Sequence, residues 1–402
     1  MPNGLTVLQY PRPSSMTAQL SIAIKYGSND DSEEQSGKAH FLEHMLVGGS
    51  RKRIRIHSEI EKSGGMSDFE TSNEHTFCIM DVFPEKIAEA SKILSSLLFE
   101  TKFEKEKLEL ERKVILNEID DSFDDPEDTV DKMLLNSLFE THPVKNPILG
   151  SRKSVEQLSL DKIEQTHRAR YSPQNMILIL TGNFSDKDVN LVLEDFQNRE
   201  NENAISKNTS QIETGEPTKR CAMARHDLKQ ANLSFGLRTT TAQDSETPIL
   251  DLIVALLELG ESSRLFVELR EKRALTYHPQ VSNTSGLDFG FLSVSCSVKS
   301  KSLNQTQNII EQELEKIKKR EITKGELDKI KNLMIGNIYR LYDNTFEFPR
   351  NLAYMEIQFN AENAQINYIN KIRSVTQRDI IKVANKYFRK NNYATAIITP
   401  KE

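Results

Sequence analysis

The sequence contains few cysteines, no long apolar run and no excess of positive charge. Only 3 cysteines occur among its 402 residues, and Cys78, Cys221 and Cys296 are widely separated. This spacing is typical neither of a disulfide framework nor of a thiolate metal site, so a reducing compartment is expected. No apolar stretch reaches the ~18 residues that a transmembrane helix requires, and the N-terminus lacks the basic and apolar regions of a signal peptide.

Charge also limits the partners that the chain can have. The formal net charge is −6, and the lysines and arginines are scattered along the chain. The absence of a basic cluster argues against nucleic acid and anionic membrane as partners. A cytoplasmic protein is expected, although a presequence removed from the mature chain would leave no trace in this sequence.

The length of the chain predicts two domains. A chain of 402 residues exceeds the usual span of one hydrophobic core and fits two domains of roughly 200 residues. Residues 198–216 are rich in Asn, Ser, Thr and Glu and precede Pro217, which is typical of a linker. The predicted domains are therefore residues 1–197 and 217–402.

The two predicted domains repeat one order of features. Ser159 begins an amphipathic segment that leads to an apolar stretch at residues 176–180, and Thr376 begins a similar segment that leads to residues 393–398. Each copy predicts a capped helix followed by a β-branched strand. Helices are also predicted at matching places further upstream, over residues 103–119 and 322–338.

Further alternating stretches complete the expected fold class. They indicate strands at residues 20–24, 76–82, 232–237 and 289–298. The sequence therefore predicts an α+β protein of two homologous domains, each a mostly antiparallel sheet packed with helices.

A histidine pair stands out in the first domain. Residues 39–47 are apolar apart from His40, Glu43 and His44, and they predict a buried helix. On a helix the two histidines lie one turn apart on one face, where both imidazoles can bind one ion, and Glu43 projects beside them. The order His-x-x-Glu-His is the reverse of the zincin motif. Two imidazoles leave zinc short of ligands, so a third, preferably a carboxylate, is expected from elsewhere.

The helix over residues 103–119 supplies the candidate. Glu111 and Glu118 share a face with Leu108 and Ile115, so two carboxylates interrupt an apolar stripe. Buried carboxylates need a cation or hydrogen bonds. We expect Glu118 to be the third zinc ligand. Glu111 is expected to orient one of the zinc-binding residues without binding the ion itself.

The internal repeat tests this assignment. By the offset between the copies, Glu118 falls opposite Asn337 and Glu111 opposite Ile330, and the segment matching the histidine helix, residues 250–259, has no histidine. A carboxylate needed only for packing would tend to recur in the second copy. Metal chemistry is therefore expected in the first domain alone. The alternative interpretations are a histidine pair satisfied by hydrogen bonds and, for Glu111, a buried ion pair.

These residues resemble the pitrilysin/insulinase family of inverted zincins, in particular its small two-domain branch similar to mitochondrial processing peptidase. The likeness extends over essentially the whole chain. Its motifs in the first domain are residues 37–45, 64–65, 71–76 and 111–118, and in the second domain residues 262–266 and 269–277.

The resemblance implies a shell-like enzyme. Each chain would form one half of a clamshell, two such halves would enclose a chamber, and an unfolded peptide would add as a strand to the sheet edge beside the metal helix. Arg270 and Tyr277 match the family's paired arginine and tyrosine and would bind the scissile carbonyl from the facing half. A homodimer is therefore expected, with pairing to a homologous chain as the other possibility.

Two departures from the family pattern concern substrate binding. Where the family has an Asn-Ala pair on the substrate-binding edge, this chain has Asp68 and Phe69, so the shape and charge of that subsite are expected to differ. The glycine-rich loop before Ser262 is reduced to residues 259–261, which weakens a claim of presequence recognition.

The function that the sequence predicts is hydrolysis of unfolded peptides by a zinc endopeptidase with one Zn²⁺ per chain. Glu43 would act as the general base, and Arg270 and Tyr277 would stabilise the oxyanion. The alternative is a catalytically inactive scaffold or partner subunit of a processing-peptidase-like complex. Such chains usually lack part of the metal set, whereas this chain retains all of it.

Overall fold

The structure is a computed structural model, and it describes residues 1–47, 51–199, 210–217, 220–319, 322–360 and 363–401. The predicted linker at 198–216 lies partly outside these residues. Within the described part, no helix is both long and apolar enough to cross a membrane.

The chain divides into two compact units, and each unit draws on both halves of the sequence. Unit 1 comprises Met1–Asp120, Asn146–Asn208 and Leu341–Ile357, and unit 2 comprises Asp121–Lys145, Thr209–Arg340 and Gln358–Glu402. The segments 121–145 and 341–357 are therefore exchanged between the two halves of the sequence.

Unit 1 is built on a five-stranded sheet with the order β1-β5-β2-β4-β3. All its pairings are antiparallel except that of β1 with β5. The strands are β1 (Thr6–Pro11), β2 (Ala18–Ile24), β3 (Met66–Thr71), β4 (Thr76–Val82) and β5 (Met176–Gly182). Strand β3 therefore lies at one edge of the sheet.

Unit 2 repeats this topology strand for strand. Its sheet has the order β6-β10-β7-β9-β8, again with one parallel pair, β10 with β6. The strands are β6 (Arg220–Arg225), β7 (Ala231–Arg238), β8 (Gln280–Ser285), β9 (Gly290–Val298) and β10 (Tyr393–Pro400). The prediction of an α+β fold with two homologous, mostly antiparallel domains is confirmed.

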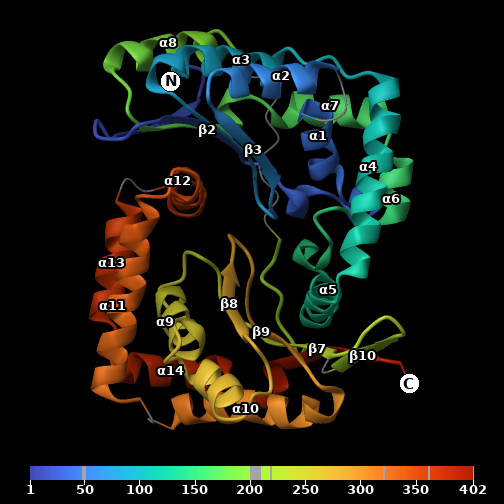
Figure 1. Cartoon of the computed structure of the whole chain (residues 1–402), viewed down its shortest axis with the longest axis vertical. Helices are drawn as coiled ribbons and strands as arrows, with labels where there is room; N and C mark the ends of the chain where they lie inside the picture. Colours follow the sequence, from blue (N-terminus) through green and yellow to red (C-terminus); the bar gives the residue numbers. More distant parts are fainter. Residues whose placement is uncertain (48–50, 200–209, 218–219, 320–321, 361–362, 402) are drawn as a thin grey trace. The chain divides into compact units, whose positions relative to one another are not determined.

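Helices pack on both faces of the unit 1 sheet (Figure 1). One face carries the larger core, which includes residues of α1 (Lys38–Val47), α3 (Ile87–Phe99), α4 (Lys105–Asp124), α7 (Leu160–Arg170) and α8 (Asp186–Gln197). The other face packs against α12 (Glu347–Phe359), where Ala353 is fully buried among Phe77, Ile79, Ile177 and Ile179. The remaining helices of this unit are α2 (Arg51–Lys62) and α6 (Arg152–Gln157).

Unit 2 is covered in a similar way. Its larger core includes residues of α9 (Thr247–Glu258), α10 (Leu303–Lys318), α11 (Lys324–Leu341), α13 (Ala364–Ser374) and α14 (Gln377–Tyr387). The other face of its sheet packs against α5 (Pro126–Leu138), whose Val130, Leu134 and Leu138 are buried with Ala396 and Ile398 of β10. The exchanged segments thus supply α12 to unit 1 and α5 to unit 2.

The helices predicted from the repeat are present. Ser159 caps α7 and Thr376 caps α14, each by accepting a hydrogen bond from a backbone N–H of the first turn. The helix predicted over residues 103–119 is α4, which begins two residues later and continues to Asp124. Its counterpart in the repeat is α11.

Candidate metal centre

Helix α1 presents both histidines on one side. Its apolar residues, including Phe41, Leu42 and Met45, are fully buried in the core against the sheet. His40 and His44 lie on the remaining face, with side chains 12% and 13% exposed. Their ring centroids are 4.6 Å apart, as expected for residues one helical turn apart.

The start of α1 is fixed by a glycine contact and a buried carboxylate. Gly37 has φ +86°, and a Cβ at this position would lie 2.5 Å from the carbonyl oxygen of Leu149 and 2.8 Å from Cα of Gly150. Only glycine tolerates both conditions. The Asp31 carboxylate, 5% exposed, accepts a hydrogen bond of 3.0 Å from the backbone N–H of Ala39. These contacts fix the first turn, which carries His40.

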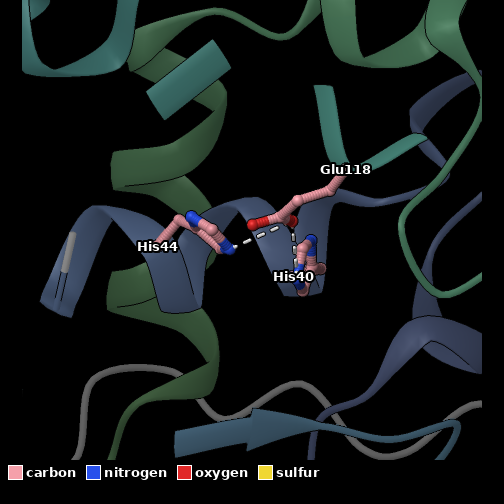
Figure 2. A group of neighbouring side chains, drawn as sticks. All are labelled: His40, His44 and Glu118. Atoms are coloured by element: carbon pink, nitrogen blue, oxygen red, sulfur yellow. Dashed lines mark ion pairs between the residues drawn. The ribbon is translucent and has the colours of Figure 1, made fainter. Parts of the chain in front are cut away.

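Helix α4 brings two carboxylates to the histidines. Leu108, Glu111 and Ile115 are buried along one face, and Glu118 continues this face with its side chain 37% exposed. The Oε2 atom of Glu118 lies 3.8 Å from Nε2 of His40 and 3.5 Å from Nε2 of His44 (Figure 2). One carboxylate oxygen thus faces both imidazole nitrogens.

Glu111 contacts the far side of the same histidine. Its Oε2 atom lies 3.0 Å from Nδ1 of His44, and the residue is only 1% exposed. A proton on Nδ1 would be donated to Glu111 and would leave the lone pair of Nε2 directed at Glu118. Glu111 therefore favours the tautomer of His44 that a metal ligand requires.

The surroundings of the two histidines shift their pKa values in opposite directions. Burial, together with the neighbouring His44, lowers the pKa of His40 to about 3, so His40 is neutral. Burial also lowers the pKa of His44, but the hydrogen bond to Glu111 and the charges of Glu118 and Glu43 outweigh this effect and leave the pKa raised. A bound cation would favour the neutral ligand form of His44.

Glu43 lies between the histidines in sequence but has a different partner. It is 8% exposed, and its Oε2 atom accepts a hydrogen bond of 2.7 Å from Oγ1 of Thr71, at the end of β3. Burial raises the pKa of Glu43, although the hydrogen bond from Thr71 acts in the opposite direction. A carboxylate with a raised pKa is suited to accepting a proton.

The donor set fits zinc. His40, His44 and Glu118 each offer one ligand atom, and these atoms lie within 4.8 Å of one another. This is the only such group of histidine, cysteine and acidic residues among the described parts of the chain. Ligands about 2.0–2.1 Å from a tetrahedral zinc ion lie about 3.3 Å apart. The separations of 3.5 and 3.8 Å exceed a hydrogen bond and are close to this value.

Asp68 and Phe69 lie on β3 but face opposite sides of the sheet. Phe69 pairs with Cys78 and packs against the core that contains α1. Asp68 pairs with Ile79 and forms an ion pair with Arg350 of α12. Alternate strand residues point to opposite faces, so these two neighbours have separate environments.

Arg270 and Tyr277 meet in unit 2. The guanidinium of Arg270 lies 4.6 Å from the ring centroid of Tyr277, and Tyr277 is 79% exposed. Arg270 belongs to a π-helical turn, η6 (Phe266–Glu271), and Ala274, between the two residues, has φ +49°. Such backbone strain is frequent at functional sites. Both residues line an open pocket of about 590 Å³, together with Lys299 and Gln230.

Three contacts at the site were not anticipated from the sequence. They are the hydrogen bond from Thr71 to Glu43, the bond from the Ala39 N–H to Asp31, and the ion pairs of Arg350 with β3. Thr71 lies in a segment already noted for its resemblance, which was the one available signal. The partners of Asp31 and Arg350 depend on packing and had no signal in the sequence.

Comparison with protein families agrees with the two-part repeat. Residues 6–152 match the family model described as Insulinase (Peptidase family M16). Residues 157–334 match the model described as the Peptidase M16 inactive domain. The histidine pair, Glu111 and Glu118 all fall within the first of these matches.

Similar proteins extend over the whole chain. The chain is 28% identical over 407 residues to an uncharacterized zinc protease of Mycobacterium tuberculosis, covering 100% of this chain and 92% of the relative. It is 27% identical over 405 residues to an uncharacterized zinc protease of Bacillus subtilis, covering 99% and 97%.

Solved structures share the fold. A protease from Helicobacter pylori aligns with a TM-score of 0.91 at 21% identity, covering 99% of this chain and 97% of that one. A peptidase M16 inactive domain from Pseudomonas fluorescens aligns with a TM-score of 0.90 at 18% identity, covering 100% and 97%. On the family matches to both halves and the likeness of its full length to zinc proteases, this chain belongs to the insulinase family of M16 peptidases.

Proposed function

We propose that the protein is a zinc-dependent endopeptidase that hydrolyses unfolded peptides. The observation that carries the proposal is the convergence of His40, His44 and Glu118, with Glu43 beside them on the same helix. Two imidazoles and one carboxylate leave a tetrahedral ion one open position, which distinguishes a catalytic zinc site from a structural one.

The residues of the chain have distinct roles in this mechanism. A zinc ion held by His40, His44 and Glu118 would act as a Lewis acid and lower the pKa of a water molecule towards ~7. The carboxylate of Glu43 accepts the proton of the attacking water and later passes it to the leaving amine. Thr71 holds one oxygen of Glu43, and Glu111 holds His44, so that both groups keep their orientation.

The substrate would bind along β3. This strand pairs with β4 on one side, and no strand pairs with its other side in the part of the chain that the structure describes. An extended peptide can add to such an edge through main-chain hydrogen bonds, which requires the substrate to be unfolded. Thr71, at the end of β3, contacts Glu43, so an added peptide would pass close to the proposed base.

Arg270 and Tyr277 are proposed to complete the site in a dimer. Their polar groups are well suited to stabilising the oxyanion, and the exposure of Tyr277 leaves it available for a ligand. Following the family resemblance, we propose a homodimer in which these residues act on the metal site of the neighbouring copy.

Substitution of the proposed base tests the function most directly. We expect Glu43→Gln to retain about one zinc ion per chain and to lower kcat for an unstructured peptide by about 10²–10⁴-fold. Zinc is measured by elemental analysis and turnover with a fluorescence-quenched peptide. Glu34→Gln, at an exposed position, is the matched control.

The outcomes separate the enzyme from a scaffold. Full activity in the Glu43→Gln variant would remove Glu43 from the mechanism. A wild-type protein that binds zinc but hydrolyses none of a diverse set of unfolded peptides would favour the scaffold function.

Mixing two inactive variants tests the shared site. A Tyr277→Phe subunit and a Glu43→Gln subunit each lack one component, and a mixed dimer would contain one intact site. We expect the mixture to recover up to about half of the activity per mixed dimer. Absence of recovery, with mixed dimers shown by mass spectrometry, would contradict action between subunits.

A further inference from the structure

The side of β3 that faces α12 carries a group of charges. The guanidinium of Arg350, on α12, donates to Oδ2 of Asp68 and lies 3.1 Å from Oε2 of Glu70. A third carboxylate, that of Glu347, lies 3.1 Å from the same guanidinium. Asp68 and Glu70 lie two residues apart on β3, so they project from the same side of the strand.

One guanidinium therefore faces three carboxylates. Arg350 is held in place, since its side chain is only 17% exposed and lies over the ring of Phe77 at 5.7 Å. The side chains of Asp68 and Glu70 remain 53% and 41% exposed. Negative charge thus exceeds positive charge in this group, and the two carboxylates of β3 are accessible to a ligand.

The position of these carboxylates matters if a peptide adds to β3, so the inference rests on the proposed function. Every second side chain of an added strand would point to the α12 side. Side chains directly opposite on paired strands have Cβ atoms about 4.5–5.5 Å apart. A substrate side chain on this side would therefore lie beside Asp68 and Glu70. It would interact electrostatically with the negative charge that Arg350 does not compensate.

We propose that Arg350 is a specificity-determining residue that sets the charge preference of the peptide-binding edge. It compensates part of the negative charge of Asp68 and Glu70, and the remaining charge favours a lysine or arginine side chain over an acidic one at the substrate position facing α12. The preferred substrates are therefore unfolded peptides with a basic residue at that position.

The test measures the preference directly. Peptides that differ only by Lys, Gln or Glu at one position, scanned along the sequence, are bound to the Glu43→Gln protein, and dissociation constants are compared. We expect Lys to bind more tightly than Glu at one position or at alternate positions. Replacing Arg350 by Met should increase the ratio of Lys to Glu affinity roughly tenfold at low salt, and less at high salt.

Two further variants keep the test decisive if the Met variant folds poorly. Arg350→Lys retains the positive charge and should leave the ratio within about threefold of its starting value. Asp68→Asn removes one carboxylate and should lower the ratio, which is the opposite direction. A loss of folding alone would weaken all peptides equally and would leave the ratio unchanged.

The matched control is Arg12→Met. Arg12 donates to the backbone of Tyr342 and lies 3.2 Å from Asp343, so it anchors the segment before α12. This variant should leave the ratio unchanged. An unchanged ratio in both Arg350→Met and Asp68→Asn, with the affinity for the Gln peptide retained, would overturn the inference.

These results are distinguishable from failure of the proposed function. A protein that cleaves peptides without charge preference along β3 would overturn the inference and support the endopeptidase. A protein that binds none of the peptides would count against both.

Discussion

The orientation of the proposed base, Glu43, depends on the hydroxyl group of Thr71. Thr71 donates to Glu43, and a hydrogen bond to a charged group contributes about 1.5–3 kcal/mol. Because Thr71 lies on β3 and Glu43 on α1, this bond also links the proposed peptide-binding edge to the carboxylate of the proposed general base.

Removal of this hydroxyl should affect turnover more than binding. We expect Thr71→Val to lower kcat by about 10–100-fold, with KM and zinc content nearly unchanged, since Glu43 would lose its orientation. Thr71→Ser retains the hydroxyl and should restore most of the activity. Steady-state kinetics of the two variants measure this difference, and a Val variant as active as the Ser variant would exclude the role.

Glu111 should act on metal affinity through His44. The Glu111→Gln substitution removes the charge behind the imidazole, and losses of this kind reduce metal affinity by about 10–100-fold. Competition with a coloured zinc chelator would measure the change. Glu109→Gln is a control on the same helix, because the side chain of Glu109 is 53% exposed. Equal affinities in the two variants would contradict the assignment.

At the scale of elements, the start of α1 depends on a buried acid. Asp31 accepts hydrogen bonds from Tyr26 and from the backbone of Ala39. Burial raises the pKa of Asp31 to about 6, and its hydrogen bonds only partly oppose this effect. The unfolded chain releases this proton near the ordinary pKa of 3.8, whereas the folded chain keeps it up to about pH 6.

The sign of the resulting pH dependence follows from proton binding. Between pH 4 and 6 the folded state binds more protons at Asp31 than the unfolded state, so stability falls as the pH rises. Protonation of Asp31 contributes fully to the free energy of unfolding below pH 3.8, and this contribution is lost above pH 6. The loss amounts to about 3 kcal/mol.

Substitution of Asp31 should remove this dependence. Asparagine can still accept a hydrogen bond from Ala39 and carries no charge. We expect the stability of Asp31→Asn relative to the wild type to increase as the pH rises from 4.5 to 7. Urea unfolding at both pH values measures this difference, in which contributions shared by the two proteins cancel. A difference that is independent of pH would contradict the raised pKa.

At the scale of the whole molecule, the two halves of the sequence exchange segments. Unit 1 takes residues 341–357 from the second half, and unit 2 takes residues 121–145 from the first. Without residues 341–357, the unit 1 sheet would expose the face that includes Phe77, Ile79 and Ile177. Loss of this burial would cost several kcal/mol at about 25 cal/mol per Å² of apolar surface.

The two halves of the sequence, expressed as separate fragments, should therefore need each other to fold. We expect fragment 1–208 expressed alone to be poorly soluble or to bind a hydrophobic dye. Co-expression with fragment 209–402 should yield a soluble complex with one copy of each fragment. Gel filtration and mass spectrometry would establish the stoichiometry. A stable, folded 1–208 fragment would show that α12 is dispensable for unit 1.

Local periodicity accounts for the parts of the site that were predicted. Helical spacing alone places His40 beside His44 and Glu111 on the same face as Glu118, because residues three or four apart share a face of a helix. The repeat likewise predicted α7, α14 and the strands that follow them. These features depend on neighbours in sequence, and the structure contains them at the expected positions.

Strand geometry separated two residues that the sequence grouped together. Asp68 and Phe69 were predicted as one substrate-binding pair, and whether they bind substrate stays a prediction. Their side chains point to opposite faces, and only the packing of α12 decided that Asp68 would have Arg350 as its partner. Arg350 is separated from Asp68 by 282 positions, and no local pattern encodes such a contact.

The helix faces, the internal repeat and the residue types of a zinc site can be predicted from the sequence, because they follow from periodicity and from ligand chemistry. Other features arise only on folding: Glu118 lies opposite both imidazoles, Thr71 holds Glu43, and α5 and α12 are exchanged between the units. These contacts depend on how distant segments bury their apolar faces, which is a property of the folded chain rather than of any single segment.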